Sequence, residues 1–411
     1  NNSTEIGMVI SQPGFDPYER DDGLHPNVVL KKRGGKLPYN DWLRQQGYEG
    51  ENPWNDYANS AEGPDGELLS GWYLKNSNLP ARVREEHSET AYMTMRAREF
   101  IQETGEVPWL CHLSYIKPHW PYMAPAPYHN MYGPNTFQPI IRDSSEKINP
   151  HPVYNAFMEM EVSQTFSTAG VRETVLPAYM GMIKQIDDHL GNLFGWLEES
   201  GKADETMIVV TSDHGDYLGD HWLGEKELFH EVSVRVPLII YDPRPEANKT
   251  RGKVVSELVE AIDLVPTFLA ATGAPSADHR LEGLSLEPLI HGEFVENWRS
   301  AVFSEIDYSY YKARDILGVG NYDARGYMVR TNDWKYIYFR GFEPQLFNLN
   351  DDPNEFQDLG RDVDYEETRR NMHAILLDRL TGRKNRVALS DEALENARGK
   401  ETSDGILIGK W

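Results

Sequence analysis

The pattern of apolar and polar positions changes twice along the chain. Residues 1–80 show little periodicity, and Pro, Gly, Asn and Asp recur through them, as in "GENPWNDYANSAEGPDGE". This composition is typical of loops, and we expect the segment to wrap around a core that other residues build. Regular helix and strand patterns begin only near Glu89.

From Glu89 to about Gly273, helix-like and strand-like segments alternate. Apolar residues recur at helical spacing over residues 89–105, 176–201 and 254–273. Short apolar runs, which are typical of buried strands, lie between them over residues 107–116, 207–210 and 235–243. This alternation predicts an α/β fold with a large mixed, mostly parallel sheet flanked by helices.

After about Gly292 the period becomes that of short alternating strands. The runs over residues 299–306, 325–341 and 344–352 predict a small antiparallel sheet, with Asn332 and Asp333 at a hairpin turn. A helix is expected over residues 365–382. We therefore predict a main α/β domain at 1–291, a C-terminal subdomain at 292–380 and a tail at 381–411. The tail ends in "GILIGKW", which would dock on its own domain or contact another subunit.

Composition narrows the classes of partner. The chain has 411 residues and a net charge of −24, which disfavours nucleic acids and anionic membranes, so an anionic substrate needs a local positive site. No apolar run approaches the length of a membrane-spanning helix. Cys111 is the only cysteine, which fits a reducing compartment. We expect a cytoplasmic protein, and the periplasm is the alternative because the N-terminal region, where a leader would lie, is expected to be missing from this sequence.

Candidate chemistry gathers in "MIVVTSDHGDYLGDHWLGEKELFHE". Asp213 and His214 directly follow the apolar run 207–210, and ligands of α/β sheets bind beyond the carboxyl ends of strands. A carboxylate and a neutral imidazole both bind divalent ions such as Mn²⁺ or Zn²⁺, and Gly215 and Gly219 permit a tight turn. Two ligands do not complete a site, and Asp-His-Gly alone is more often a turn with a capping aspartate.

Two cations extend this picture. Lys226 lies a short loop downstream, where it would neutralise a sulfate or phosphate oxygen and stabilise a leaving group, or else be a solvated surface lysine. Lys117 and His119 follow the run 107–116, and Pro118 and Pro121 would stiffen their loop. His119 is therefore a candidate general acid, and a structural histidine is the equal alternative.

Several of these segments resemble one family. "TSDHGDYLGDHWLGEK" resembles the carboxyl-side metal motif of the sulfatase branch of the alkaline phosphatase superfamily, and "KPHWPY" resembles its histidine loop. "AIDLVPTFLAATG" and "QLFNLNDDPNEFQDLG" match further along the chain. The loop "HWPYMAPAPYHNMY" and the tail "GRKNRVALSDEAL…GILIGKW" are similar to those of phosphonate monoester hydrolases. The resemblance runs from about Asn76 to Trp411, is specific as a joint pattern, and implies an alkaline phosphatase-like fold.

The resemblance also implies roles for four residues. Asp213 and His214 would ligate a single divalent metal ion, Lys226 would bridge the transferred group and the leaving oxygen, and His119 would contact the leaving group. In many sulfatases an amide replaces His214, so the imidazole favours the phosphonate and phosphodiester branch. It also favours Mn²⁺ over Ca²⁺, with Zn²⁺ as a further alternative. His221 and His230 receive no predicted role.

The nucleophile of such enzymes is a formylglycine, formed from the cysteine of a Cys-x-Pro/Ala-x-Arg segment. Cys111 is followed by "HLSY" and lacks this pattern, so we predict that it is a small buried apolar residue. Two further metal aspartates are also absent from the sequence. We therefore expect a preceding N-terminal segment of about three βα units, at ~30 residues each, that carries them.

The predicted function is metal-dependent hydrolysis of phosphonate monoesters and phosphodiesters, with sulfate esters as a side activity. The alternatives are a dedicated aryl or choline sulfatase, and an inactive relative that binds anionic esters. The expected partner is a small anionic ester, with neither nucleic acid nor membrane. The resemblance implies a homo-oligomer, either a dimer or a tetramer.

Overall fold

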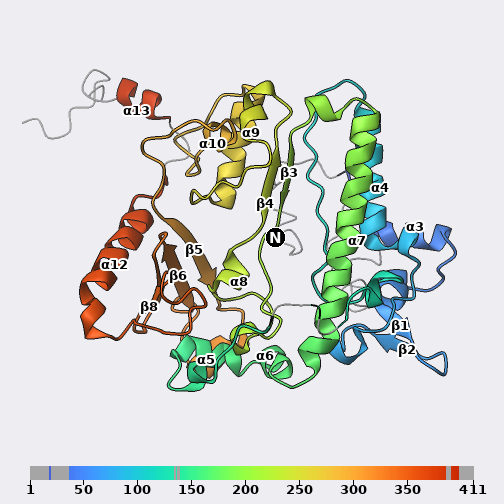
Figure 1. Cartoon of the computed structure of the whole chain (residues 1–411), viewed down its shortest axis with the longest axis horizontal. Helices are drawn as coiled ribbons and strands as arrows, with labels where there is room; N and C mark the ends of the chain where they lie inside the picture. Colours follow the sequence, from blue (N-terminus) through green and yellow to red (C-terminus); the bar gives the residue numbers. More distant parts are fainter. Residues whose placement is uncertain (1–17, 20–36, 134–135, 137–138, 386–389, 398–411) are drawn as a thin grey trace, which may run out of the picture. The chain divides into compact units, whose positions relative to one another are not determined.

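A computed structural model describes residues 18–19, 37–133, 136, 139–385 and 390–397 (Figure 1). Its contacts divide the chain into two compact units. The first unit contains residues 1–140 and 165–203, and the second contains residues 141–164 and 204–411. The two units are described separately. The domain boundaries near residues 291 and 380 stay a prediction, and the apolar end of the tail lies outside the described residues.

The first unit is mainly helical. Its described elements are the helices α3 (Pro38–Gln45), α4 (Glu89–Thr104) and α7 (Val171–Glu199), the antiparallel strands β1 (Ser60–Glu62) and β2 (Leu68–Ser70), and the short turns η1 (Trp54–Ala58), η2 (Leu74–Asn76), η3 (Glu85–His87) and η4 (Tyr128–Asn130). Helix α4 starts where the Ser88 side chain accepts a hydrogen bond from the Ala91 amide, and it ends at Gly105 with φ 58°. These caps confirm the helix predicted over residues 89–105.

Helices α4 and α7 pack against each other in this unit. Gln185 of α7 donates a hydrogen bond of 2.8 Å to the Ser88 hydroxyl, and His189 Nε2 lies 2.7 Å from Glu85 Oε1. A buried cluster forms next to them, with the members Leu37, Tyr39, Leu43, Trp54, Ala58, Ala61, Ala81, Val83, Tyr92 and Met123. The loop-rich N-terminal residues therefore contribute a core of their own, whereas we expected them only to wrap around one.

The second unit contains two sheets. Its strands are β3 (Ile208–Thr211), β4 (Leu238–Tyr241), β5 (Val302–Asp307), β6 (Arg325–Arg330), β7 (Trp334–Phe339) and β8 (Gln345–Asn348). Its helices are α5 (Pro152–Met158), α8 (Glu231–Val234), α9 (Leu264–Thr272), α10 (Glu287–Ile290), α11 (Lys312–Leu317), α12 (Glu366–Thr381) and α13 (Asp391–Ala397), while α6 (Glu161–Phe166) crosses the division. Short turns complete it: η5 (Ser144–Lys147), η6 (Ala203–Glu205), η7 (Asp220–Trp222), η8 (Pro245–Lys249), η9 (Ala261–Asp263) and η10 (Val363–Tyr365).

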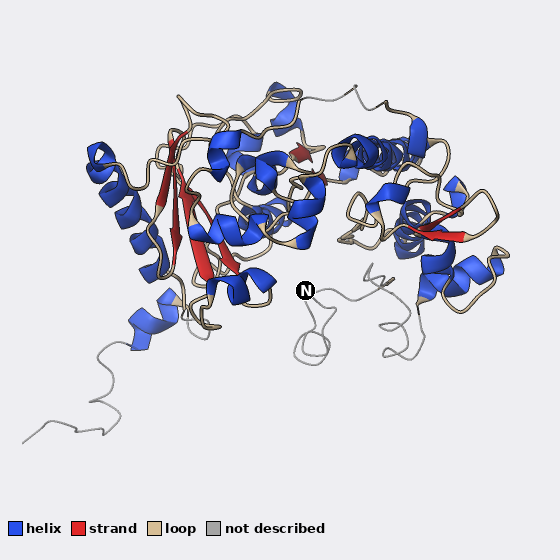
Figure 2. Ribbon diagram, turned by 90° about the horizontal axis from the view of Figure 1, so that it is seen from below, coloured by secondary structure: helices blue, strands red, loops and turns tan. Residues whose placement is uncertain are grey.

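The C-terminal sheet has the strand order β5-β6-β7-β8 and is antiparallel throughout. Its alternating side chains are buried on both faces, since Val329, Tyr336 and Leu346 pack with α12, and their sequence neighbours Met328, Ile337 and Phe347 pack with α5 and α11. Figure 2 shows α12 lying along one face of this sheet. The predicted antiparallel sheet and its helix are confirmed, including the turn at Asn332 and Asp333.

Three predicted elements differ from the structure. Residues 107–116 form no strand, and Val107 and Leu110 are exposed, because the described residues offer this run no neighbouring strand for its hydrogen bonds. The helix expected over residues 254–273 is a 3-10 turn from Ala261 followed by α9, so residues 254–260 were wrongly predicted. Strands β3 and β4 pair antiparallel, so the described part of the main sheet shows none of the expected parallel pairing.

Candidate active site

Asp213 and His214 lie in the turn that follows β3, as the apolar run predicted. His214 Nδ1 lies 2.7 Å from the carbonyl oxygen of Gly215, which can only accept, so Nδ1 carries the ring proton. The other nitrogen, Nε2, then carries the lone pair and lies 3.5 Å from Asp213 Oδ2. The Oδ1 atom of Asp213 accepts from the His214 amide at 3.0 Å, which holds the carboxylate in place.

This pair fits two ligands of one metal ion. Two ligands of a tetrahedral ion at ~2.0–2.1 Å stand roughly 3.4 Å apart, close to the separation of Nε2 and Oδ2. The carbonyl of Gly215 fixes the tautomer and the ring orientation, as partners of ligating histidines do. With 86% of the Asp213 side chain and 29% of the His214 side chain exposed, both stay within reach of further ligands and of a substrate.

The turn depends on two glycines, in different ways. A Cβ atom on Gly215 would lie 1.9 Å from the carbonyl oxygen of Val232, so only glycine allows the two backbones to approach this closely. Gly219 has φ 96°, a left-handed conformation that L side chains rarely adopt. The expected tight turn is confirmed at Gly219, whereas Gly215 permits a close approach of two backbones instead of a turn.

The same close approach connects the Asp213–His214 turn to the segment that carries Lys226. The Gly215 amide donates to Ser233 O at 2.7 Å, and the Tyr217 amide donates to Glu225 O at 2.7 Å. The Ser233 hydroxyl in turn donates to the carbonyl oxygen of Lys226. These hydrogen bonds hold the loop that carries Lys226 directly beside the loop that carries Asp213 and His214.

Carboxylates flank Lys226 on both sides in the sequence. Burial, followed by the neighbouring Glu227, raises the pKa of Glu225 to about 7, while Lys226 opposes this rise. Glu227 is itself buried, and its Oε2 accepts from the Lys226 amide at 3.0 Å. Near neutral pH, the proton on Glu225 therefore decides how much negative charge faces the lysine.

His119 belongs to the first unit and was predicted on a loop after residues 107–116. Its Nδ1 lies 2.9 Å from the carbonyl oxygen of Trp120, and the two rings pack with centroids 4.3 Å apart. These contacts orient the imidazole. Since His119 and Lys226 lie in different units, each is described only against its own surroundings.

Lys117 has a structural role instead. Its Nζ donates to Asn59 Oδ1 at 2.8 Å and to Pro121 O at 2.7 Å, and it is 8% exposed. Burial lowers the pKa of Lys117 to about 8. Lys117 and Pro121 stand on either side of His119 in this loop. The hydrogen bonds of Lys117 thus link the two sides to each other and to Asn59. Cys111 is only half-buried, less than predicted, and burial raises the pKa of its thiol.

The sequence analysis missed two groups in the second unit. Glu146, His221 and His230 lie together although 75 residues separate the first two. Lys335 is fully buried within strand β7, where the alternating pattern gives no sign of a buried charge. Lys335 pairs with Glu231 and Glu355. The residues of both groups come from distant segments, so their proximity can be seen only in the folded chain.

Two family descriptions match the chain. Residues 35–274 match the family described as Sulfatase, and residues 219–381 match N-sulphoglucosamine sulphohydrolase, C-terminal. The first match covers more than half of the chain and contains Asp213, His214, Lys226 and His119. The second match begins at Gly219 and extends over the C-terminal sheet.

Relatives and solved structures agree with this assignment. The Multifunctional alkaline phosphatase superfamily protein PehA of Trinickia caryophylli is 30% identical over 80% of this chain and 65% of its own length. An arylsulfatase of Clostridium perfringens is 31% identical over 67% of this chain and 54% of its own length. The chain thus spans less than two thirds of both relatives. The phosphonate monoester hydrolase SpPMH from Silicibacter pomeroyi is 26% identical with a TM-score of 0.76, covering 92% of this chain and 78% of that one.

Proposed function

Because this chain belongs to the sulfatase family, within the alkaline phosphatase superfamily, we propose that it hydrolyses phosphonate monoesters and phosphodiesters, with sulfate esters as a side activity. The observation that carries the proposal is the Asp213–His214 pair, with Nε2 and Oδ2 3.5 Å apart beyond β3. The likeness to SpPMH supports the choice of phosphonate over sulfate.

Asp213 and His214 would hold a divalent ion, Mn²⁺ by preference. When bound, the ion acts as a Lewis acid that draws charge from the transferred group and lowers the pKa of a coordinated oxygen. The Gly215 carbonyl keeps the His214 lone pair on Nε2, so the chain itself presents the ligand atom in the correct tautomer.

Lys226 would neutralise charge on the transferred group and on the leaving oxygen. A compact ammonium suits both positions. When Glu225 is protonated, it no longer neutralises the positive charge of Lys226, so more of that charge can act on the substrate. His119 would donate a proton from Nε2 to the leaving alcohol, with Nδ1 anchored on Trp120 O.

The nucleophile is proposed to be a formylglycine, which supplies the attacking oxygen through its hydrated aldehyde. Cys111 is not its source, because "CHLSY" lacks the proline and arginine of the modification motif. Peptide mass spectrometry of active protein tests this part, since an active enzyme without a formylglycine peptide would contradict it.

Steady-state kinetics with one aryl leaving group test the substrate class. The ratio of kcat/KM for the aryl phosphonate monoester to that for the aryl sulfate should exceed one, and Asp213→Ala should abolish both activities. A ratio well below one would identify a dedicated sulfatase. Absence of turnover in active-site-complete protein would identify an inactive relative that binds anionic esters.

A further inference from the structure

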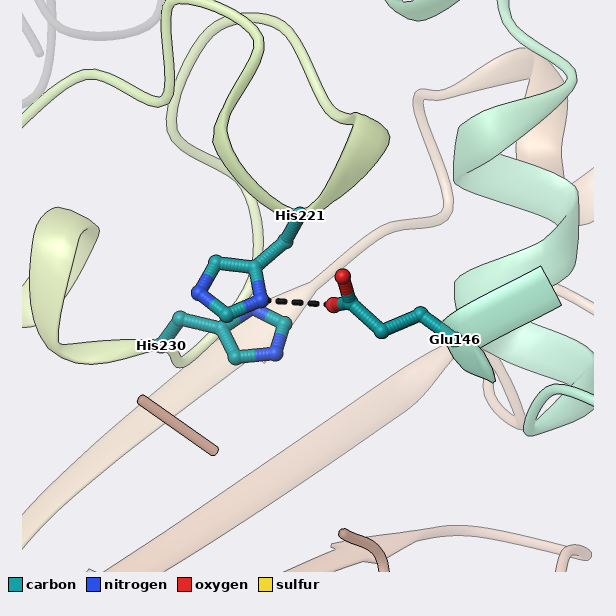
Figure 3. A group of neighbouring side chains, drawn as sticks. All are labelled: Glu146, His221 and His230. Atoms are coloured by element: carbon teal, nitrogen blue, oxygen red, sulfur yellow. Dashed lines mark hydrogen bonds and ion pairs between the residues drawn. The ribbon is translucent and has the colours of Figure 1, made fainter. Parts of the chain in front are cut away.

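Glu146, His221 and His230 converge on one point in the second unit, although none belongs to the proposed active site. Glu146 lies in η5, His221 in η7, and His230 directly before α8. One ligand atom from each lies within 4.8 Å of the others. Figure 3 shows the Glu146 carboxylate reaching His221 Nδ1, with Oε1 2.7 Å from the nitrogen, and the ring of His230 beside them.

We propose that Glu146, His221 and His230 form a binding site for a divalent transition-metal ion, with Zn²⁺ as the best match, made of residues other than the Asp213–His214 pair. Two imidazoles and one carboxylate are the protein ligands of Zn²⁺ sites that keep one position open. The set contains both nitrogen and oxygen donors, which disfavours Ca²⁺.

His230 is prepared for this role by its neighbours. Its Nδ1 lies 3.0 Å from the Tyr217 hydroxyl and 3.3 Å from the Tyr154 hydroxyl, so Nε2 is the atom left for a ligand bond. Partners on the second ring nitrogen orient ligating histidines in just this manner.

The segments that bring the ligands together are firmly connected. The His221 amide donates to Ile141 O at 2.7 Å, and the Ile141 amide donates to Asp220 Oδ1 at 2.9 Å. The indole of Trp222 donates to Asp143 O at 2.8 Å. These contacts hold the backbone before η5 beside η7, so Glu146 and His221 start from neighbouring positions.

A cavity gives the site room for an ion and a further ligand. It has a volume of about 390 Å³, and its lining includes Glu146, His221, His230, His151, Gln345 and Arg361. Gln345 is 4% exposed, and among the described residues its Oε1 has no hydrogen-bond partner. A buried amide oxygen without a partner normally binds water or an ion, which is an independent sign of a missing occupant.

The two imidazoles must separate when the ion binds. Their rings are stacked, with centroids 3.7 Å apart and planes inclined by 5° (Figure 3). Lone pairs lie in the ring planes, so one ion cannot face both nitrogens of a parallel stack. His230 is held by Tyr217 and Tyr154, whereas His221 is held by the Glu146 carboxylate, itself a ligand. His221 is therefore the ring that turns, and the ion replaces the proton it shares with Glu146.

An ion at this position would connect η5 to both ends of the segment between His221 and His230. That segment carries Lys226. A bound ion would therefore restrict its motion as well as raise the stability of the unit.

Co²⁺ and Zn²⁺ titrations of the metal-stripped full chain test the proposal. The chain carries Asp213→Asn and His214→Asn, so the proposed active-site ion is lost and the two sites cannot be confused. We expect one Co²⁺ per chain with the intense visible absorption of a four-coordinate ion, and its displacement by Zn²⁺. Failure to bind Co²⁺ in this background would overturn the inference and leave the proposed function untouched.

Further substitutions in the same background identify the ligands. Glu146→Gln or His221→Asn should weaken Co²⁺ binding by at least about 100-fold, and Tyr217→Phe by about 10- to 100-fold, as loss of a supporting partner does. The control His112→Asn removes an exposed imidazole and should change nothing. Unchanged affinity in both Glu146→Gln and His221→Asn would refute the site. If His230→Asn does not fold, Glu146→Gln still decides, because Glu146 is only partly buried, whereas both histidines are buried.

Discussion

The Nζ atom of Lys335 lies 2.6 Å from Oε1 of Glu355, and their side chains are only 0% and 2% exposed. The same ammonium lies 2.8 Å from Glu231 Oε1 and donates to Phe229 O at 2.8 Å. Phe229 and Glu231 follow closely after Lys226. Strand β7 thus anchors the segment that carries the candidate catalytic lysine to the C-terminal sheet.

Removal of this buried cation should be more harmful than removal of one carboxylate. Lys335→Met leaves the buried Glu355 without its cation and Glu231 with Arg330 alone, and we expect it to lower the free energy of unfolding by about 3–5 kcal/mol. Glu355→Gln keeps the Lys335–Glu231 pair and should cost less. Urea unfolding of both variants measures the difference. The exposed pair Arg370–Glu366 supplies the control, since Arg370→Ala should leave the midpoint nearly unchanged.

The close approach at Gly215 predicts a second effect. Gly215→Ala places a methyl group against Val232 O and should destabilise the protein by about 1–3 kcal/mol. It should also weaken Mn²⁺ binding, because the shift moves Asp213 and His214. Gly191→Ala is the matched control, since nothing lies within 4 Å of its added Cβ in α7 and the change should stabilise by about 0.5–1 kcal/mol. Equal stability of the two variants would contradict the packing argument.

The role assigned to Lys226 predicts a dependence on the leaving group. Lys226→Ala should lower kcat/KM for aryl phosphonates by about 10²–10³-fold, as loss of one preorganised charge partner does. The loss should grow as the leaving alcohol becomes more basic, because more charge then develops on its oxygen. His119→Ala should show the same trend with a loss of about 10²–10⁴-fold. A loss that is independent of leaving-group pKa would assign both residues to substrate binding alone.

Glu225 predicts how stability depends on pH. Its pKa is about 7 in the folded protein against an ordinary 4.5, so the folded state holds the proton more tightly than the unfolded chain. This stabilisation is fully present below pH 4.5 and is lost as pH rises through 7. Glu225→Gln mimics the protonated form and should therefore be more stable than the parent above pH 7, but not below pH 4.5. Thermal unfolding across this range measures it, with the exposed Glu49→Gln as the control. A constant difference at all pH values would exclude Glu225 as the cause.

The periodic elements were predictable because their signals are local. Helix α4 has apolar spacing, a Ser88 cap and a terminal Gly105 in the sequence, and the C-terminal strands alternate at period two. The turn at Asp213 and His214 was also predictable, because an apolar strand runs directly into these two candidate ligands. The strand predicted over residues 107–116 is absent from the structure. A strand also needs a neighbouring strand to pair with, and its own sequence does not specify one.

The sequence by itself determined the family, the helices α4, α7 and α12, and the order of Asp213, His214 and Lys226 along one segment. The tertiary structure alone decided that Gly215 meets Val232, that Lys335 is buried between two carboxylates, and that Glu146 reaches His221. The physical reason is the distance along the sequence over which each kind of interaction acts. Helix period and capping act between residues three or four apart, whereas burial and charge pairing depend on segments that only folding brings together.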